Sequence, residues 1–346
     1  MKNPYTGNAP STFWKTGVTA HQYDEKFSIF PDLYKKKFEI NNTSYICTSG
    51  SCFAQHIHRN LKRRNFKLID EEPAPKYLAF PKDYGFDLYS ARYGNIYSSR
   101  QLLQLLEEAL GINSWKPVIW QRSGSYFDAL RPTVEPDGLP SNEHVHLARS
   151  QHLEAVRRLV EKVDVFIFTM GLTETWLCTE SGRALPTAPG VVAGEFNPSS
   201  YKAWNMNYID ILADMKKIIS IIRQARPYCK FIFTVSPVPL VATFEDRHIL
   251  SSTIYSKSTL RAVAGDLQNR YEFVDYFPSY EIITGIQAAG RYFENNLREV
   301  NERGVSLAMN TFIQQFWDPS NTQELIDNDQ TVADLVCDEE LVEREI

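Results

Sequence analysis

The sequence predicts an α/β protein in which helices pack on both faces of a parallel sheet. Val163–Gly171 and Cys229–Pro237 are nearly continuous apolar runs, which is typical of strands that are buried on both faces. Segments with strand character also alternate with segments of helical periodicity along most of the chain. Strands that are separated by helices usually pair in parallel, because the helix returns the chain to the edge from which it started. We therefore expect one domain over residues 41–317.

Five segments are expected to form the strands of this sheet. Ser44–Thr48 is apolar and β-branched and ends where a helical pattern begins, so it is expected to be the first strand. Phe66–Asp70 is a short second strand, the two apolar runs are the third and fourth, and Tyr271–Phe277 is the fifth.

Helices are expected where apolar residues recur three and four positions apart. The expected helices are Phe53–Asn65, Ser99–Leu110, Glu143–Lys162, Asn207–Arg226, Ser256–Arg270 and Gly304–Phe316. In the helix Glu143–Lys162, Leu147 and Val156 are expected on the apolar side.

Three regions lie outside this alternation. Residues 1–40 are rich in aromatic residues and interrupted by Pro and Gly, so they are expected to form an irregular N-terminal arm over the core. Residues 113–141 contain four prolines and are expected to form a long insertion in the domain. Residues 318–346 are acidic, show apolar periodicity only in short patches, and are expected to form a C-terminal tail.

Composition and charge exclude several classes of function. The chain has 37 Lys and Arg against 42 Asp and Glu, a net charge of −5, so no nucleic-acid partner is expected. It shows neither a signal pattern near its start nor an apolar run of about 20 residues, so we expect a cytoplasmic protein without a membrane span. The five cysteines are widely spaced, which favours reduced thiols. His144 and His146 lack further ligands nearby, and neither a metal nor another cofactor is expected.

Polar side chains gather where four of the predicted strands end. Ligands of such sheets bind outside the carboxyl ends of the strands, so these residues are candidates for a site. The polar groups are in Ser49–Cys52 after the first strand, in Gly171–Glu174 after the third, in Ser236–His248 after the fourth and in Ser279–Glu281 after the fifth.

The stretch Ser49-Gly50-Ser51-Cys52 joins a strand directly to a helix. Gly50 can supply the backbone freedom that such a tight turn needs. The residue that follows lies at a helix N-terminus, where unpaired N–H groups can lower the pKa of a thiol and can hold an oxyanion. This arrangement is typical of acyl-transfer enzymes. The alternative is that Ser51 merely caps the helix and Cys52 is a small buried filler.

Several segments resemble the GSCFA family, which belongs to the SGNH/GDSL-hydrolase superfamily. They are "TSGSCFAQHI", "YGNIYSSRQLLQLL", "DALRPTVEP", "FTMGLTETW", "TVSPVPLVAT", "YSKSTLRA" and "YFPSYEIITG", in that order over about residues 40–316. The resemblance implies a three-layer α/β/α sandwich with a five-stranded parallel sheet, as in SGNH hydrolases and flavodoxin-like folds. It also implies acyl-ester chemistry.

The resemblance implies roles for individual residues. Matching Gly50 to the Gly of the Gly-Asp-Ser-Leu motif makes Cys52 the nucleophile, and a shift of one residue makes it Ser51 instead. Gly94 in "YGNIY" resembles the Gly of the second motif, and Thr173 in "GLTE" falls where an Asn is expected in the third. The oxyanion would then be held by Thr173 and by the N–H groups of Cys52 and Gly94. Further substrate-binding candidates near these motifs are Gly50, Asn95, Glu174 and Glu281.

The base of the superfamily is a His near the C-terminus, and it is absent here. The corresponding stretch "FENNLREV" offers Asn296 and Glu299. We therefore consider Glu299 as the base, or His248 in the loop after the fourth strand. His56 is a further alternative, since it lies four residues beyond Cys52 and thus about one helical turn away.

Together these residues predict an acyl-ester enzyme, either an esterase or an O-acyltransferase, with a small-molecule or glycan substrate. A carbohydrate or related hydroxylated substrate is expected, and a place in surface-polysaccharide metabolism is a hypothesis. The alternative is a catalytically inactive module of the same fold that binds a glycan or a nucleotide-sugar. The sequence does not predict an oligomeric state.

Overall fold

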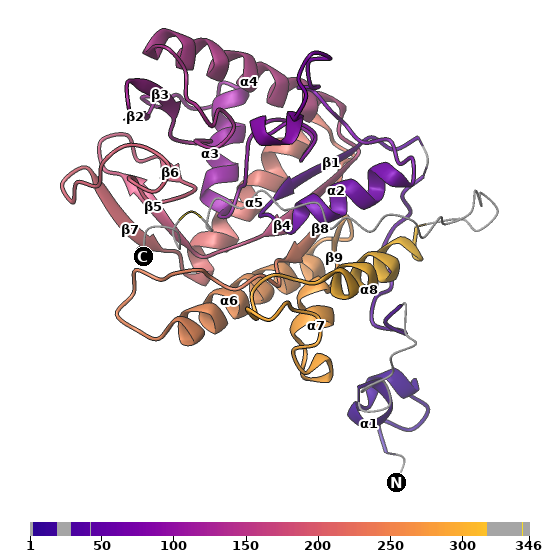
Figure 1. Ribbon diagram of the computed structural model, residues 1–346. Coiled ribbons are helices and arrows are strands. Elements are labelled where there is room, and N and C mark those ends of the chain that lie inside the picture. The colour runs from indigo at the N-terminus through magenta and orange to yellow at the C-terminus, as the bar shows by residue number, and fades with distance from the viewer. Residues whose placement is uncertain (1–2, 19–28, 42, 317–340, 342–346) are drawn as a thin grey trace.

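The computed structural model of the protein describes residues 3–18, 29–41, 43–316 and 341. At its centre lies a parallel sheet of β1 (Ile46–Gly50), β4 (Val165–Met170), β8 (Lys230–Val235) and β9 (Val274–Tyr276). The strands lie in the order β1-β4-β8-β9 (Figure 1). The parallel sheet that was predicted from the apolar runs is therefore present.

The predicted second strand is reduced to a single bridge, so the sheet has four strands in the described part of the chain rather than five. Leu68 pairs in parallel with Ile46, and the Ile69 N–H donates to the Ile46 carbonyl at 2.8 Å. The ladder cannot continue along β1, because Ser90 occupies the next position on that edge. The Thr48 N–H donates to the Ser90 hydroxyl at 3.0 Å.

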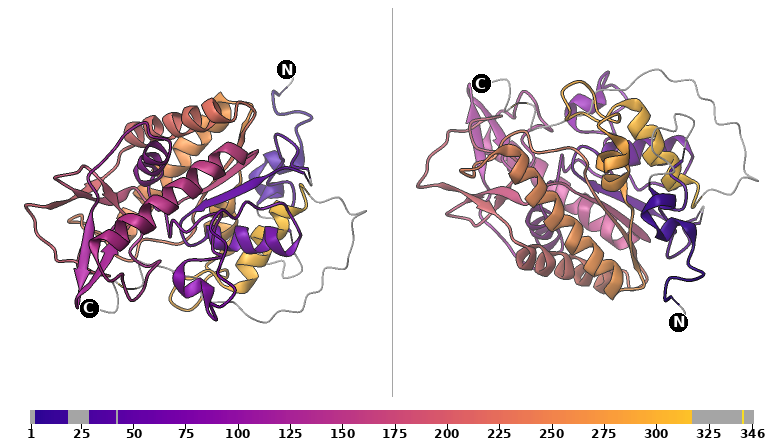
Figure 2. Two further views of the ribbon diagram at one scale, coloured as in Figure 1. Left: turned by 90° about the horizontal axis from the view of Figure 1, so that it is seen from above. Right: turned by 90° about the horizontal axis from the view of Figure 1, so that it is seen from below.

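Helices pack on both faces of this sheet (Figures 1 and 2). Side chains of a strand point alternately to the two faces, so in β4 Phe166 and Phe168 face one apolar cluster while Val165 and Ile167 face the other. The first cluster includes residues of α3 (Ser99–Ala109), α4 (Asn142–Lys162), α5 (Tyr208–Ala225) and α6 (Ile249–Arg270). The second includes residues of α2 (Ala54–Arg63), α7 (Ser279–Thr284) and α8 (Glu302–Ile313).

The longer helices follow the sequence predictions closely apart from two differences, and the short helix α7 was not predicted. Helix α6 begins at Ile249 rather than Ser256, because the His248 side chain accepts a hydrogen bond from the Leu250 N–H and caps an earlier start. Leu147 was expected on the apolar side of α4, but 58% of it is exposed. The buried face of α4 contains Val156, as predicted, and Val145 in place of Leu147.

Two smaller β elements were not predicted. Residues 113–141 contain the hairpin of β2 (Ile119–Arg122) and β3 (Ser125–Asp128), whose turn residues Ser123 and Gly124 both have positive φ. A second, antiparallel sheet consists of β5 (Glu174–Cys178), β6 (Ala184–Leu185) and β7 (Tyr201–Asn205). These strands are short and only partly buried, so their apolar pattern is weak.

The flanking regions are described in part. The N-terminal arm contains the short helices η1 (Pro10–Thr12) and α1 (Trp14–Gly17), and Phe30 and Tyr34 pack into the cluster next to α8. Elsewhere η3 (Pro81–Tyr84) and η4 (Ile286–Ala288) are single turns. The predicted acidic tail lies outside the described residues, except residue 341. Across the residues that the structure describes, none of the helices combines the length and the apolar character that crossing a bilayer demands.

Gly50 ends β1 in a conformation that other residues rarely adopt. Its φ is +138°, and a side chain there would overlap the backbone of Thr169 on the neighbouring strand β4. We expect Gly50→Ala to lower the free energy of unfolding by about 3 kcal/mol or more, because backbone strain and overlap act together. Chemical denaturation measures this loss. Gly111→Ala is the matched control, since Gly111 has a positive φ of +67° but open space around it.

Candidate active site

Three chain segments meet at the carboxyl ends of β1 and β4, and we call this place the strand-end site. The segments are residues 50–52, 94–97 and 169–173. The Ser51 N–H donates to the Thr169 carbonyl at 3.1 Å, and the Ile96 N–H donates to the Gly50 carbonyl at 2.9 Å. The Gly171 N–H closes the group by donating to the Tyr97 carbonyl at 3.1 Å. Backbone hydrogen bonds thus join segments that are far apart in the sequence, and Ser51 and Thr169 are more than 100 positions apart.

Ser51 is the residue on which these segments converge. Its side chain packs against Gly171, because a Cβ atom added to Gly171 would lie 3.0 Å from the Ser51 Cβ. Its carbonyl accepts the Ala54 N–H at 2.8 Å and so opens the first turn of α2. The Ser51 hydroxyl is buried and has no hydrogen-bond partner among the described residues. Ser51 therefore does not use its hydroxyl as a cap.

Cys52 points into a different environment. Only 3% of it is exposed, and it belongs to the apolar cluster that also contains Phe53 and Ile57 of the α2 region and Phe312 of α8. A thiol among hydrocarbon side chains is typical of a structural cysteine. Both candidate nucleophiles are thus nearly completely buried, and they differ in that the Ser51 hydroxyl has no partner among the described residues whereas Cys52 packs in an apolar cluster.

Two further hydroxyl groups near Ser51 are also without a partner. Thr169 near the end of β4 and Thr173 just beyond it are both buried, and neither hydroxyl makes a hydrogen bond to any residue that the structure describes. The buried Ser49 hydroxyl, near the end of β1, is a fourth without a partner in the described residues. Buried polar groups are nearly always paired, so four unpaired hydroxyls near the ends of two adjacent strands are unusual. Such groups are available to a ligand.

Most backbone N–H groups at this place are already engaged. Those of Ser51, Gly171 and Leu172 donate to carbonyls, and that of Thr173 donates to the Ser256 hydroxyl at 3.0 Å. The first N–H groups of α2, those of Ala54, Gln55 and His56, also donate to carbonyls. An oxyanion would therefore have to be held by side chains, such as the Thr173 hydroxyl.

Asn95 was predicted to bind substrate and lies beside Ser51. Its side-chain oxygen accepts hydrogen bonds from the Tyr89 hydroxyl and from Gln55 Nε2, the latter at 3.4 Å. The Tyr89 hydroxyl lies 3.2 Å from the Ser51 carbonyl, so this polar group supports the turn. Gly94 adopts a φ of +67° next to Arg131 and Val134, on the side of residues 113–141.

Residues 45–312 of the chain match the sequence model of the GSCFA family. The chain belongs to the GSCFA family. No curated protein with a matching sequence was found. Among solved structures, a carbohydrate esterase family 3 protein from Talaromyces cellulolyticus is 15% identical, with a TM-score of 0.27 over 62% of this chain and 87% of that one. An acetyl esterase mutant with acetate ion is 14% identical, with a TM-score of 0.26 over 63% of this chain and 90% of that one. Similarity this loose does not bear on activity.

In this GSCFA chain, two residues of α6 that were given no role from the sequence hold the strand-end site together. The buried Lys257 ammonium donates to the Gly171 carbonyl at 2.7 Å, and Ser256 accepts the Thr173 N–H. Both fix the loop that packs on Ser51. The only signal in the sequence was the family segment "YSKSTLRA", which contains both residues.

The two predicted bases are not brought to Ser51. His248 is exposed, and its Nδ1 accepts the Leu250 N–H at 3.2 Å. Glu299 is also exposed, and its backbone pairs with Glu294 and Asn296. Neither forms a hydrogen bond with Ser51 or Cys52 in the described residues.

Glu174 and Glu281 are committed to structural contacts. Glu174 accepts hydrogen bonds from the Thr243 hydroxyl at 2.7 Å and the Phe244 N–H at 3.3 Å, which holds the loop after β8 against β5. Burial raises the pKa of its carboxyl group. Glu281 lies 2.5 Å from Arg261 Nε and accepts the Tyr276 hydroxyl at 2.8 Å.

His56 and His58 on α2 are buried and neutral. Burial and the charge of Arg59 lower the pKa of His56 to about 3, and its Nε2 has no hydrogen-bond partner within the described ranges. Burial lowers the pKa of His58 to about 4, and its Nδ1 lies 2.7 Å from the Thr48 hydroxyl. His56 lies about one helical turn beyond Cys52 and is buried. Its low pKa makes it a weak base.

Proposed function

We propose that the protein performs acyl-ester chemistry at the strand-end site with Ser51 as the nucleophile. The observation that carries this proposal is the Ser51 hydroxyl, which is buried without a partner at the start of α2 and beside Gly171. Leaving a hydroxyl unpaired in the interior costs about 1–3 kcal/mol, and a merely structural position gains nothing from it. A hydroxyl group that reacts with a substrate, in contrast, is expected to have no hydrogen bond within the protein that competes with the reaction.

The chemistry would proceed in two half-reactions. The Ser51 oxygen attacks the ester carbonyl carbon, the bond from that carbon to the alcohol oxygen breaks, and the alcohol leaves with the Ser51 proton. Water or a second hydroxyl group then attacks the acyl-Ser51 ester, and the Ser51 hydroxyl is restored. The Thr173 hydroxyl is proposed to hold the oxyanion in both steps. Gly94 and Asn95 would line the same place.

His248 or Glu299 is proposed to take the proton after a movement that substrate binding favours, because neither contacts Ser51 here. Hydrogen bonds of a catalytic base are often completed only when substrate is bound. A carbohydrate or related hydroxylated acyl acceptor is proposed from the family resemblance. Whether the second half-reaction is hydrolysis or transfer depends on whether water or that hydroxyl reaches the acyl group first.

The test is to trap the acyl group. The full chain is incubated with p-nitrophenyl acetate, quenched in acid, digested and analysed by mass spectrometry. We expect acetylation of Ser51 in the wild type and its loss in Ser51→Ala. Acetylation confined to Cys52 would show that the motif alignment was right about the nucleophile, and no adduct at either residue would overturn the proposal.

A second candidate function is a binding module that has lost catalysis. It is favoured by the near-complete burial of Ser51, which is 2% exposed, and by the lack of a proton acceptor bonded to it in the described residues. A module of this kind would bind a glycan or a nucleotide-sugar without turning over any ester. Finding glycan binding that survives Ser51→Ala, with no adduct in the wild type, would select it.

A further inference from the structure

We propose that a cavity away from Ser51 binds an oxyanion group, a phosphate or a carboxylate, of a small molecule. The cavity, called here the arginine cavity, has a volume of about 20 Å³ for the centre of a water-sized molecule and is partly open to solvent. It is lined by Tyr93, Ile96, Gln101, Gln104, Leu105, Leu130, Arg131, Arg149, His152, Arg183 and Ala184. Ser51 and Cys52 do not line it, and the proposal does not depend on the proposed function.

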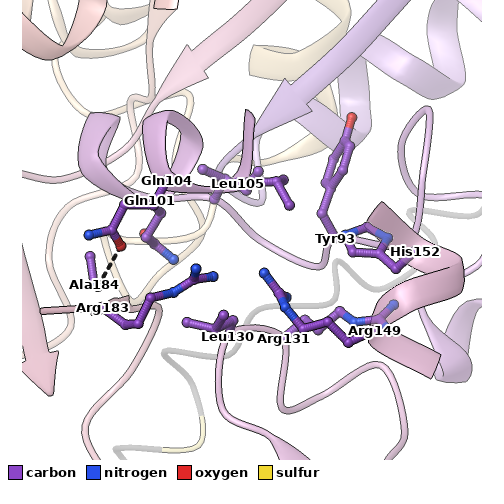
Figure 3. Close-up of a pocket in the computed structure, with 11 residues that line it drawn as sticks. Tyr93, Gln101, Gln104, Leu105, Leu130, Arg131, Arg149, His152, Arg183 and Ala184 are labelled. Atoms are coloured by element: carbon purple, nitrogen blue, oxygen red, sulfur yellow. Dashed lines mark hydrogen bonds between the residues drawn. The ribbon is translucent and has the colours of Figure 1, made fainter. Parts of the chain in front are cut away.

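The wall of the arginine cavity is rich in positive charge. Arg183, just before β6, enters from one wall, and Arg131 and Arg149 enter from the opposite wall (Figure 3). All three side chains are nearly completely buried, with exposures of 2% for Arg183, 4% for Arg131 and 7% for Arg149. Arginine is the side chain best suited to a planar oxyanion, since its N–H groups match two oxygens at once.

The carboxylates that balance these charges are not part of the cavity lining. Asp128 lies 3.1 Å from Arg131 Nε and 3.2 Å from Arg149 Nη1, and Glu108 pairs with Arg149. The two arginines hold the pKa of Asp128 well below its usual range, although burial alone would raise it. No carboxylate is among the described residues that line the cavity. Each of the three guanidinium groups is paired with a carboxylate, Arg183 with Glu108 at 2.7 Å, but the carboxylates do not line the cavity.

Three polar atoms of the wall lack a hydrogen-bond partner among the described residues. Arg183 Nε has no hydrogen-bond acceptor among the described residues, and Arg183 Nη1 lies 2.7 Å from Glu108 Oε2 without hydrogen-bond geometry. His152 Nε2 is likewise unpartnered there, on a side chain that is 1% exposed. An unpaired guanidinium N–H inside a protein costs free energy unless a ligand accepts it. Arg183 is thus the residue that an oxyanion would satisfy.

His152 suits a hydroxyl group on the same ligand. Its Nδ1 lies 2.7 Å from Glu72 Oε2, while burial and Arg131 lower its pKa. The neutral imidazole accordingly donates from Nδ1 to the carboxylate and offers Nε2 as an acceptor. A hydrogen phosphate, or a carboxylate with a neighbouring hydroxyl, presents both the acceptor oxygens that Arg183 needs and the donor that His152 needs.

The test measures anion binding directly. Inorganic phosphate and acetate are titrated into the full chain at constant ionic strength with chloride as the reference, and binding is followed by calorimetry and by the thermal midpoint. We expect phosphate to bind and to raise the midpoint. Arg183→Gln should weaken binding at least about tenfold. The matched control Arg63→Gln, at an exposed arginine of α2, should leave binding unchanged.

Absence of a midpoint shift or heat with either anion in the wild type would overturn the proposal, as would unchanged binding in Arg183→Gln. If Arg183→Gln does not fold, the wild type still decides, because phosphate should shift the ring resonances of His152 and leave those of the exposed His144 unchanged. Phosphate affinity should survive Ser51→Ala. Loss of ester chemistry and loss of anion binding are therefore separate outcomes. A preference for phosphate over acetate identifies the class of ligand.

Discussion

Ser51→Ala is expected to lower the turnover of p-nitrophenyl acetate by about 10³-fold or more, because removing a nucleophile leaves only binding and oxyanion stabilisation. The same change should not reduce stability. The Ser51 hydroxyl is buried and unpartnered within the described residues, so its removal deletes an unpaired polar group from the interior. The expected signature is a thermal midpoint equal to or above that of the wild type, together with lost turnover. A hydroxyl with a structural role would show the opposite pattern.

Cys52→Ala is the matched control. Cys52 follows Ser51 directly, and its side chain is of almost the same size. Unlike that of Ser51, the Cys52 side chain packs in the apolar cluster of α2 and α8. We expect it to cost about 1 kcal/mol of stability through the cavity that it leaves, and to keep turnover within a few-fold of the wild type. Full activity in Ser51→Ala combined with loss in Cys52→Ala would reverse the assignment of the nucleophile. Full activity in both would remove acyl-enzyme chemistry from this turn.

The sequence was sufficient to place the strand-end site but not to resolve its details. Long apolar runs predicted β4 and β8, and the rule that parallel sheets bind ligands at the carboxyl ends of strands pointed to Ser51 and Thr173. Ser51 and Gly171 are more than 100 positions apart, and the parallel pairing of β1 with β4 brings them together. The choice between Ser51 and Cys52 was open, because it depends on the surroundings of each side chain: Cys52 packs in an apolar cluster, whereas Ser51 packs against Gly171.

Other features depend on tertiary contacts that leave no periodic signal. The predicted second strand fails because Ser90, 42 residues after Thr48, takes the edge of β1. Lys257 lies within a regular helix, and nothing in its local sequence indicates that its ammonium group reaches the Gly171 carbonyl. Arg131, Arg149 and Arg183 come from three separate segments, so each alone is most simply interpreted as a surface charge. Buried charge clusters of this kind require coordinates.

The stability of the protein is expected to fall steeply as the pH drops from 6.5 to 5. An unfolded histidine has a pKa of about 6.5, whereas the folded pKa values of His56 and His58 are about 3 and about 4. Between these limits the unfolded chain binds protons that the folded chain does not, so each histidine favours unfolding as the pH falls. His152 acts in the same direction, since its pKa is also lowered.

Each buried histidine should remove about 2 kcal/mol of stability between pH 6.5 and 5. The sum over several such histidines approaches the whole free energy of unfolding of a typical domain. Denaturant unfolding at half-unit steps of pH measures this slope. His58→Gln, which can keep a hydrogen bond to the Thr48 hydroxyl, should reduce the slope by about one proton, or about 1.4 kcal/mol per pH unit. His146→Gln is the control at an exposed position of α4 and should leave the slope unchanged. An equal slope in the wild type and His58→Gln would contradict this prediction. It would mean that His58 is protonated in the folded protein, and therefore that water reaches its side chain.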